Sequence, residues 1–283
     1  MRYVQLRAFH YVATRGGFSR AAEALFLTQP AISDQVRKLE EAYDILLFDR
    51  HKRRVVLTDK GAELLEITHR MFDAEALALD YLNESRALEA GTLRLVVDSA
   101  FHVTAILRRF QARYPAIKIS LKVGNSEDVT KALQAYSADI GVLGELAEAT
   151  EFEVLPLGET PLIAFAAKAG AYAGKTEISY AELAEAPLVM REKGSKTRQK
   201  LEAAAGQKLV ASIEADGREA VREIVAAGHG VGFVSTAEFG KDERLFKINL
   251  PSPAPMMQES LICMKARRER RLIKAFMEIA AED

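Results

Sequence analysis

Residues 21–40, AAEALFLTQPAISDQVRKLE, constrain the fold of this chain more than any other stretch. Apolar residues keep helical spacing on both sides of a short break, and Thr28 is placed to cap the second helix. In that helix Ile32, Val36 and Leu39 form one stripe at positions i, i+4 and i+7, which predicts a buried face. The stretch therefore predicts two short helices joined by a tight turn.

Polar side chains occupy the remaining arc of the second helix. A short helix of this kind suits the major groove of DNA, because Gln pairs with adenine and Arg or Lys with guanine or phosphate. Asp34 is open to two interpretations, since a carboxylate is repelled by phosphate but accepts a hydrogen bond from cytosine N4. The predicted DNA-contacting residues on this helix are Gln29, Pro30, Ser33, Asp34, Arg37 and Lys38.

A basic run follows between two apolar segments, as at the tip of a β-hairpin. Helix, turn, second helix and basic hairpin come in the order of a winged helix-turn-helix, whose wing touches phosphates or the minor groove. The alternative is a solvated charged loop beside an ordinary small helical bundle. The predicted DNA contacts of the wing are Arg50, Lys52, Arg53 and Arg54.

The charge of the chain is unevenly distributed. Its 39 Lys and Arg against 40 Asp and Glu give a formal net charge of -1. Residues 1–60 hold eleven Lys or Arg and seven Asp or Glu, a balance of +4, which leaves 28 against 33, or -5, for the remainder. Binding to DNA depends on the field within a Debye length of about 8–10 Å, so the basic first part is compatible with a nucleic-acid module.

A long helix is predicted after the hairpin, with Thr58 as its cap and Asp59 in the first turn. Apolar residues recur at helical spacing towards Gly91, and about thirty helical residues span roughly 45 Å. Because so much apolar surface is unfavourable in water, we expect it to pack against a second copy of the chain. The alternative is a helix folded back on its own domain.

Strands alternate with helices in the rest of the chain. Residues 92–144 contain strand patterns separated by helical patterns, and a second such series begins near Pro161. This alternation predicts two α/β units with largely parallel sheets, and a ligand cleft beyond the carboxyl ends of the strands. The closing segment RERRLIKAFMEIAA is amphipathic and predicted to be helical.

Polar loops at the predicted strand ends form the candidate ligand site. The loop REKGSKTRQK places hydroxyls and cations at a helix start, where free backbone N–H groups favour an anion. It lacks the glycine frame of a nucleotide P-loop. The alternative for each residue is ordinary helix capping. The predicted ligand contacts are Ser99, His102, Asn125, Ser126, Ser195, Lys196, Thr197, Arg198 and Arg218.

Several classes of protein are disfavoured by what the sequence lacks. No apolar run approaches the roughly 20 residues of a membrane helix and the N-terminus does not resemble a signal peptide, so we expect a cytoplasmic protein. The single cysteine, Cys263, excludes an internal disulfide and a cysteine-based metal cluster, and neither a metal nor a cofactor is expected. Scattered histidines and the lack of catalytic motifs argue against an enzyme. The alternative is an enzyme for a small phosphorylated or carboxylated metabolite with an attached helix-turn-helix.

The segment FSRAAEALFLTQPAISDQVRKLEEAYDILLFDRHKRRVVLTDKGAELL resembles the N-terminal domain of LysR-type transcriptional regulators. The resemblance implies a homodimer or tetramer on an approximately palindromic DNA operator, with a small anionic effector as ligand. It also implies an α/β fold with a winged helix-turn-helix head, a linker helix and a two-lobed effector domain like a periplasmic binding protein. The expected domains are residues 1–58 for the head, 59–89 for the dimerisation helix and 90–283 for the effector domain, with lobe 1 at about 90–160 and 266–283 and lobe 2 at about 161–265.

Three further segments, LVMREKGSKTRQKLEAA, GREAVREIVAAGHGVGFVSTAEFG and RRERRLIKAF, resemble the branch of this family associated with 2-aminoethylphosphonate catabolism. The resemblance implies a small phosphonate effector, bound by the hydroxyls and cations above. Its ammonium end would need a carboxylate such as Asp98, Glu145 or Asp216. An organic carboxylate would use much the same donors.

Overall fold

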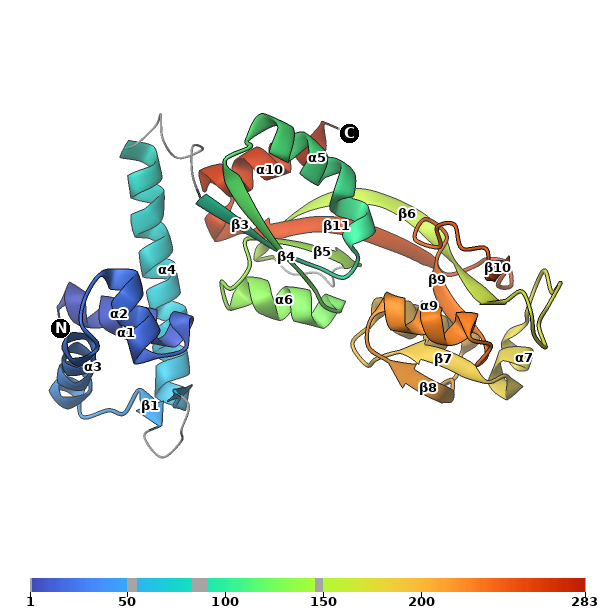
Figure 1. Ribbon diagram of the computed structural model, residues 1–283, viewed down its shortest axis with the longest axis horizontal. Helices are drawn as coiled ribbons and strands as arrows, with labels where there is room; N and C mark the ends of the chain where they lie inside the picture. The colour runs from blue at the N-terminus through green and yellow to red at the C-terminus, as the bar shows by residue number, and fades with distance from the viewer. Residues whose placement is uncertain (1, 50–54, 83–90, 146–149, 283) are drawn as a thin grey trace. The chain divides into compact units, whose positions relative to one another are not determined.

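The chain divides into two compact units, residues 1–82 and 83–283 (Figure 1). The structure, a computed structural model, describes residues 2–49, 55–82, 91–145 and 150–282. No helix in these ranges is long and apolar enough to cross a membrane.

The first unit is a winged helix-turn-helix followed by a long helix. Ile32, Val36 and Leu39 are buried against Phe9 and Leu47, as the apolar stripe predicts. The hydroxyl of the predicted cap residue Thr28 accepts a hydrogen bond from the Ala31 N–H. The elements are α1 (Tyr3–Arg15), α2 (Phe18–Leu25), α3 (Gln29–Tyr43), an antiparallel pair of β1 (Phe48–Asp49) and β2 (Val56–Leu57), and α4 (Asp59–Leu82).

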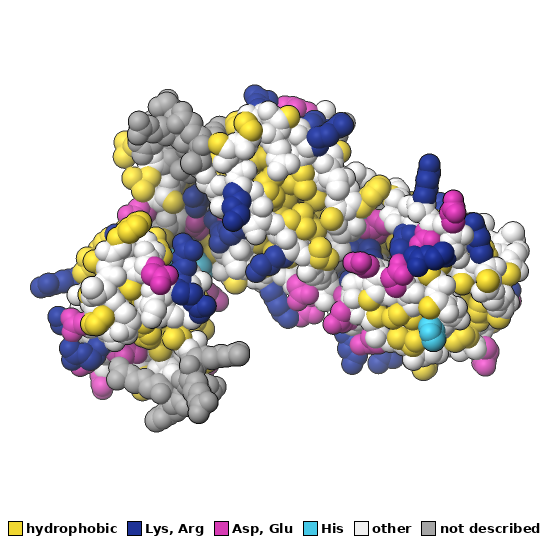
Figure 2. Space-filling model, in the orientation of Figure 1, with side chains coloured by type: hydrophobic (Ala, Val, Ile, Leu, Met, Phe, Trp, Pro, Cys, Tyr) yellow, Lys and Arg dark blue, Asp and Glu magenta, His cyan; other side chains and the backbone are white. Residues whose placement is uncertain are grey.

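The long helix α4 begins where the sequence predicts, because the Thr58 hydroxyl accepts a 3.0 Å hydrogen bond from the Gly61 N–H. Its apolar residues divide between two environments. Leu64, Leu65 and Met71 pack against the core of their own unit. Hydrophobic side chains lie on the surface towards the other end of the helix, where Leu82 is 75% exposed (Figure 2, upper left). Part of the predicted stripe is therefore used within the head, and part remains available to a second copy.

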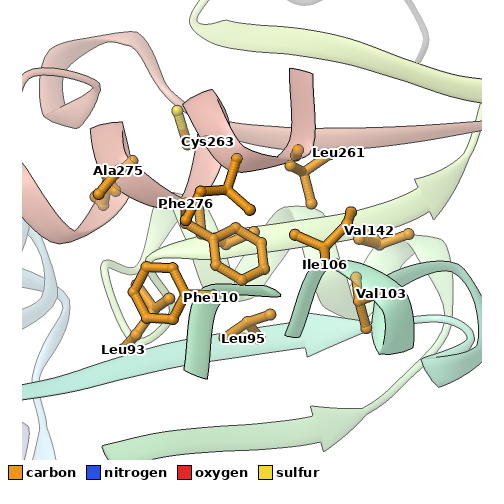
Figure 3. Packing of buried hydrophobic residues seen from close by; sticks show 14 of the residues in the cluster. Leu93, Leu95, Val103, Ile106, Phe110, Val142, Leu261, Cys263, Ala275 and Phe276 are labelled. Carbon is orange, nitrogen blue, oxygen red and sulfur yellow. The ribbon is translucent and has the colours of Figure 1, made fainter. Parts of the chain in front are cut away.

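The second unit consists of two lobes joined by two long strands. The first lobe has a parallel sheet of three strands, which pairs with the antiparallel strand β11. Its main core lies between this sheet and the helices α5 and α10 (Figure 3), so the last helix returns to the first lobe. The elements are β3 (Gly91–Val97), the 3₁₀ helix η1 (Ala100–Val103), α5 (Thr104–Arg113), β4 (Ile117–Val123), α6 (Ser126–Gln134), β5 (Ile140–Gly144), β11 (Met256–Met264), the 3₁₀ helix η2 (Lys265–Arg267) and α10 (Arg271–Ala281).

The second lobe has its own cores around an antiparallel sheet and a parallel pair, β7 with β8. Here β6 pairs antiparallel with β9 and β10, so the parallel pairing predicted from the sequence holds only for part of each lobe. The elements are β6 (Phe152–Ala167), α7 (Tyr180–Glu185), β7 (Leu188–Arg191), α8 (Lys196–Ala205), β8 (Ala211–Ala215), α9 (Arg218–Ala226), β9 (Gly232–Ser235) and β10 (Leu245–Ile248).

The strands β6 and β11 pass side by side from one lobe to the other (Figure 1). They pair antiparallel from Phe152 opposite Met264 to Pro161 opposite Met256, with a register shift at Glu259. Beyond Pro161, β6 continues into the sheet of the second lobe. The strands β6 and β11 connect the two lobes, and the part of them near Pro161 and Glu259 is called the hinge below. A cleft lies where loops of the first lobe face loops of the second lobe.

A buried carboxylate fixes the connection from α3 to the hairpin. Glu40 is buried, and its Oε1 accepts hydrogen bonds from the backbone N–H groups of Leu47 at 2.8 Å and Phe48 at 3.3 Å. Buried backbone donors need an acceptor, and a charged one is the strongest. Glu40 therefore ties the end of α3 to the start of the hairpin at β1.

We expect Glu40→Ala to destabilise the first unit by about 2–3 kcal/mol, because two buried donors lose their acceptor. The adjacent Glu41 is exposed and pairs with Arg37 at 2.8 Å, so Glu41→Ala is the matched control. Exposed pairs of this kind contribute less than about 1 kcal/mol. Thermal unfolding of both variants checks the expectation, and equal losses would contradict it.

The contact between α1 and α4 contains a buried histidine. His10 Nδ1 lies 3.1 Å from the Thr68 hydroxyl, and its ring packs against those of His69 and Phe72. Burial, with the neighbouring His69, lowers the pKa of His10 to about 4. The folded unit therefore holds His10 in its neutral form at neutral pH.

The unfolded chain binds a proton at His10 near its ordinary pKa of about 6.5, whereas the folded chain does so only near pH 4. The stability of the head is therefore expected to be constant above about pH 6.5 and to fall as the pH drops from there to about 4. Amide exchange of α1 between pH 7 and 5 measures this loss. His10→Gln should reduce it, whereas the exposed His229→Gln should leave it unchanged.

Candidate DNA interface and effector cleft

The candidate reading helix α3 exposes most of the residues that the sequence assigns to DNA. Gln29 and Pro30 are exposed at its start, Arg37 and Lys38 are exposed further along, and Ser33 is half-buried. The opposite face holds the buried stripe. The helix α3 therefore has one buried face and one largely exposed face, as the helical spacing predicts.

Asp34 forms ion pairs with both basic residues of its own helix. Its carboxylate lies 2.7 Å from Arg37 Nη2 and 2.6 Å from Lys38 Nζ. The hydrogen bonds from Lys38 and Arg37 lower the pKa of Asp34 below its ordinary value. Arg37 is paired a second time, with Glu41. In the free protein, Asp34 therefore partly neutralises the cations that would meet phosphate.

The hairpin that the sequence predicts is present as β1 and β2. The tip candidates Arg50, Lys52, Arg53 and Arg54 lie outside the described residues. A further exposed residue, Phe26, was not among the DNA contacts predicted from the sequence. Phe26 is 96% exposed and adopts a left-handed backbone conformation, with φ 55°, in the turn before α3. An exposed aromatic ring beside the reading helix suits apolar contact with a thymine methyl group.

The cleft between the lobes of the second unit is lined by the starts of three helices, α6 from the first lobe and α8 and α9 from the second. Each helix start carries a positive partial charge from its unpaired N–H groups. The term interlobe cleft is used below for the space lined by Asp98, Asn125, Ser126, Arg191, Ser195, Lys196, Thr197 and Arg218.

The start of α8 provides most of the polar groups from the second lobe. Ser195 and Thr197 are both only 3% exposed. Ser195 occupies the N-cap position, yet its side chain makes no capping hydrogen bond, so capping does not explain this hydroxyl. Lys196 lines the cleft beside them.

The two lobes touch at the loop before α8. The backbone of Gly194 has a φ of 91°, and an added Cβ would lie 3.1–3.2 Å from the side chains of Glu127 and Asn125 in the first lobe. The Asn125 amide donates a 3.5 Å hydrogen bond to the Lys193 carbonyl. A glycine at this position allows the close approach, because other residues are strained at such φ values.

On the first lobe, Asp98 lies at the carboxyl end of β3 and is buried. Its Oδ2 accepts hydrogen bonds from the Gly144 N–H at 2.8 Å and the Ser126 hydroxyl at 3.3 Å. Its Oδ1 is buried without a hydrogen-bond partner among the described residues. Burial raises the pKa of Asp98 above its ordinary value, against the opposing effect of Arg218. Asp98 thus offers an acceptor to a donor that enters the cleft.

Two predicted ligand contacts also have local capping roles. The Asn125 side chain accepts a hydrogen bond from the Asp128 N–H and so caps α6. The Ser99 hydroxyl accepts one from the Phe101 N–H at the start of η1, and Ser99 does not line the cleft. Both residues therefore cap a helix start, and Asn125 also lines the cleft.

Arg198 lies outside the residues that line the interlobe cleft. Its guanidinium donates to the Arg191 carbonyl at 3.0 Å and pairs with Glu202 and Glu214. Arg191, which was not predicted, lines the cleft instead, and Glu192 holds it through hydrogen bonds of 2.7 Å and 2.6 Å. The start of α8 was predicted from the sequence. The directions of the Arg191 and Arg198 side chains depend on their carboxylate partners, which the sequence pattern does not reveal.

Arg218 and His102 meet buried carboxylates at the hinge. Arg218 Nε lies 3.1 Å from Glu238 Oε2, and its Nη1 donates to the Asp98 carbonyl. His102 Nε2 lies 3.2 Å from Glu238 Oε1. Burial acts to raise the pKa of Glu238, but the hydrogen bond to His102 and the charge of Arg218 outweigh it and lower that pKa to about 2. Glu238 is therefore ionised.

Glu259, on β11, is the third carboxylate at the hinge. It is 3% exposed, and neither of its oxygens has a hydrogen-bond partner among the described residues. Burial, together with the charges of Asp98 and Glu238, raises the pKa of Glu259 to about 9. The sequence analysis missed Glu238 and Glu259, because a single acidic residue after or within a strand carries no local signal of burial.

The two interpretations of Asp34 predict opposite effects on DNA binding. If Asp34 mainly neutralises Arg37 and Lys38, Asp34→Asn should tighten binding to DNA. The slope of the logarithm of the DNA association constant against the logarithm of the salt concentration should then become steeper by about 1–2. Fluorescence anisotropy over a salt series measures both quantities. Weaker binding confined to sites with one particular cytosine would instead show that Asp34 reads that base.

Comparison with known proteins agrees with both units. Residues 3–62 match the family described as "Bacterial regulatory helix-turn-helix protein, lysR family", and residues 86–283 match "LysR substrate binding domain". The RuBisCO operon transcriptional regulator of Allochromatium vinosum is 32% identical over 287 residues, covering 99% of this chain and 95% of that protein.

Solved structures show the same fold. A full-length OxyR variant from Pseudomonas aeruginosa superposes with a TM-score of 0.81 at 18% identity, covering 99% of this chain and 94% of that one. The regulatory domain of CcmR from Synechocystis, solved in complex with 2-PG, has a TM-score of 0.59 at 25% identity and covers 68% of this chain and 97% of that domain. These relatives are regulators rather than enzymes, and the chain belongs to the LysR family of bacterial transcriptional regulators.

Proposed function

We propose that this LysR-type regulator responds to a small anionic effector bound in the interlobe cleft. The observation that carries the proposal is the convergence of three helix starts on one space that is also lined by Lys196 and Arg218. Backbone N–H groups, helix dipoles and cations together favour an anion. The hydroxyl of Ser195 is buried and makes no capping hydrogen bond, which supports the same assignment.

Asp98 is the candidate partner for a second, cationic group on the effector. Of the three carboxylates considered for an ammonium, Asp98 alone lines the cleft, and its Oδ1 has no partner among the described residues. Glu145 pairs with Lys200 at 2.8 Å, and Asp216 is exposed. A zwitterion such as 2-aminoethylphosphonate would place its phosphonate at the start of α8 and its ammonium at Asp98.

The CcmR complex with 2-PG supports a small ligand in a domain of this fold, and the Allochromatium relative is named for the RuBisCO operon. Neither name points to a phosphonate. The proposal therefore rests on the hydrogen-bond donors and cations of the cleft. These groups suit phosphonates, 2-PG and organic carboxylates alike, so binding measurements must distinguish these ligands.

The DNA-binding part of the proposal places α3 in the major groove, with Gln29, Ser33 and Arg37 facing bases or phosphates. The wing residues Arg53 and Arg54 follow as phosphate or minor-groove contacts. The exposed apolar end of α4 would pack against a second copy, so that two reading helices meet the half-sites of an approximately palindromic operator in the cytoplasm. Closure of the lobes on an effector would bias this arrangement only if the effector binds the two states with different affinity.

A thermal-shift panel of 2-aminoethylphosphonate, methylphosphonate and 2-PG tests the cleft. An anion present at 100 times its Kd should stabilise the wild-type protein by about 2.7 kcal/mol. Lys196→Ala should weaken binding about tenfold through the loss of one charge-assisted hydrogen bond. Lys208→Ala, on an exposed lysine of the same lobe outside the cleft, should bind as the wild type does.

Asp98→Asn separates the effector classes. It should reduce the shift with 2-aminoethylphosphonate more than the shift with methylphosphonate, which has no ammonium. Equal shifts for Lys196→Ala and Lys208→Ala would show that the anion binds elsewhere, and no shift with any anion would contradict the proposed effector class.

A further inference from the structure

We propose that His102, Glu238 and Glu259 form a binding site for a divalent first-row transition metal such as Zn²⁺ at the hinge of the effector domain. The three residues come from three different segments. His102 lies on η1 of the first lobe, Glu238 follows β9 in the second lobe, and Glu259 lies on the crossing strand β11 at its register shift. An ion bound there would join both lobes to the hinge.

The distances between the ligand atoms fit one ion. His102 Nε2 lies 3.2 Å from Glu238 Oε1 and 3.6 Å from Glu259 Oε1, and all three ligand atoms lie within 4.8 Å of one another. Ligands about 2.0–2.2 Å from a tetrahedral Zn²⁺ are separated from one another by roughly 3.3–3.5 Å. One imidazole and two carboxylates form a nitrogen and oxygen set that such ions accept, with a further position left for water.

Glu259 is a buried polar side chain without a hydrogen bond among the described residues, which points to a ligand independently of the clustering. It is 3% exposed, and both of its oxygens are buried without a hydrogen bond among the described residues. A buried carboxyl group without partners is costly, and native structures usually satisfy such groups. A cation between Glu259 and His102 would supply the missing interaction.

Neighbouring groups orient Glu238 towards this position. Its Oε2 accepts a 2.8 Å hydrogen bond from the Ser235 hydroxyl and lies 3.1 Å from Arg218 Nε, which leaves Oε1 to face His102. Outer partners of this kind hold metal ligands in place. Arg218 also repels a cation, but it faces three acidic groups, Asp98, Glu238 and Glu259, and it is already paired with Glu238.

The proposed metal ligands are different residues from those that line the interlobe cleft. The three ligands do not line the interlobe cleft, although Asp98 and Arg218 belong to both surroundings.

The test uses the full-length, untagged protein, freed of metal by chelation and titrated with Zn²⁺ in a thermal-shift assay and with Co²⁺ by visible absorption. Wild type should show a rise in Tm and a Co²⁺ band that saturates at one ion per chain. Glu259→Gln should weaken binding at least about tenfold. Glutamine keeps the shape of the neutral acid, so this variant should fold as the wild type does.

His102→Gln is the second ligand variant and should lose the same Co²⁺ band. His229→Gln, which removes an exposed imidazole outside the cluster, should keep the full response. Ser195→Ala, which alters the interlobe cleft, should also keep it, so a failed effector proposal is distinguished from a failed metal proposal. The metal site is overturned if wild type shows no Zn²⁺ or Co²⁺ response, or if Glu259→Gln and His102→Gln respond as wild type does.

Discussion

The ion cluster around Arg218 is the interaction on which the arrangement of the two lobes depends. Arg218 begins α9 of the second lobe, donates to the backbone carbonyl of Asp98 in the first, and pairs with Glu238 at 3.1 Å. Buried charges are tolerated only with partners, and removing one partner costs more than the pair contributes. The lobes therefore cannot separate without exposing these charges to water or leaving some of them unpaired.

This constraint connects the hinge to the cleft. The same Arg218 that anchors the lobes also lines the space where the starts of α6, α8 and α9 converge. An anion drawn to those helix starts would compete with Asp98 and Glu238 for the guanidinium. Effector binding would thereby change the electrostatic balance that holds the lobes in place, which is the differential interaction that a ligand-driven change requires.

The sequence predicted those features that depend on local periodicity. The stripe of Ile32, Val36 and Leu39, the cap at Thr28 and the strands β3 to β5 all follow from patterns within about 15 residues. The first half of β6 and the return of β11 were not predicted, because their pairing joins residues about a hundred positions apart and leaves no periodic signal.

Two residues of the candidate site show the same limit of sequence-based prediction. Arg198 was assigned to the cleft from its place at a helix start, yet Glu214 and Glu202 hold it outside. Glu259 was not among the predicted site residues, because it meets His102 only through the fold.

The central claim is that the starts of α6, α8 and α9 act together as one anion site. Amide hydrogen exchange of the full chain, with and without saturating 2-PG or 2-aminoethylphosphonate, tests it most directly. The account predicts that exchange slows together in the first turns of all three helices, from both lobes. Protection limited to one lobe, or found only away from these helix starts, would contradict it.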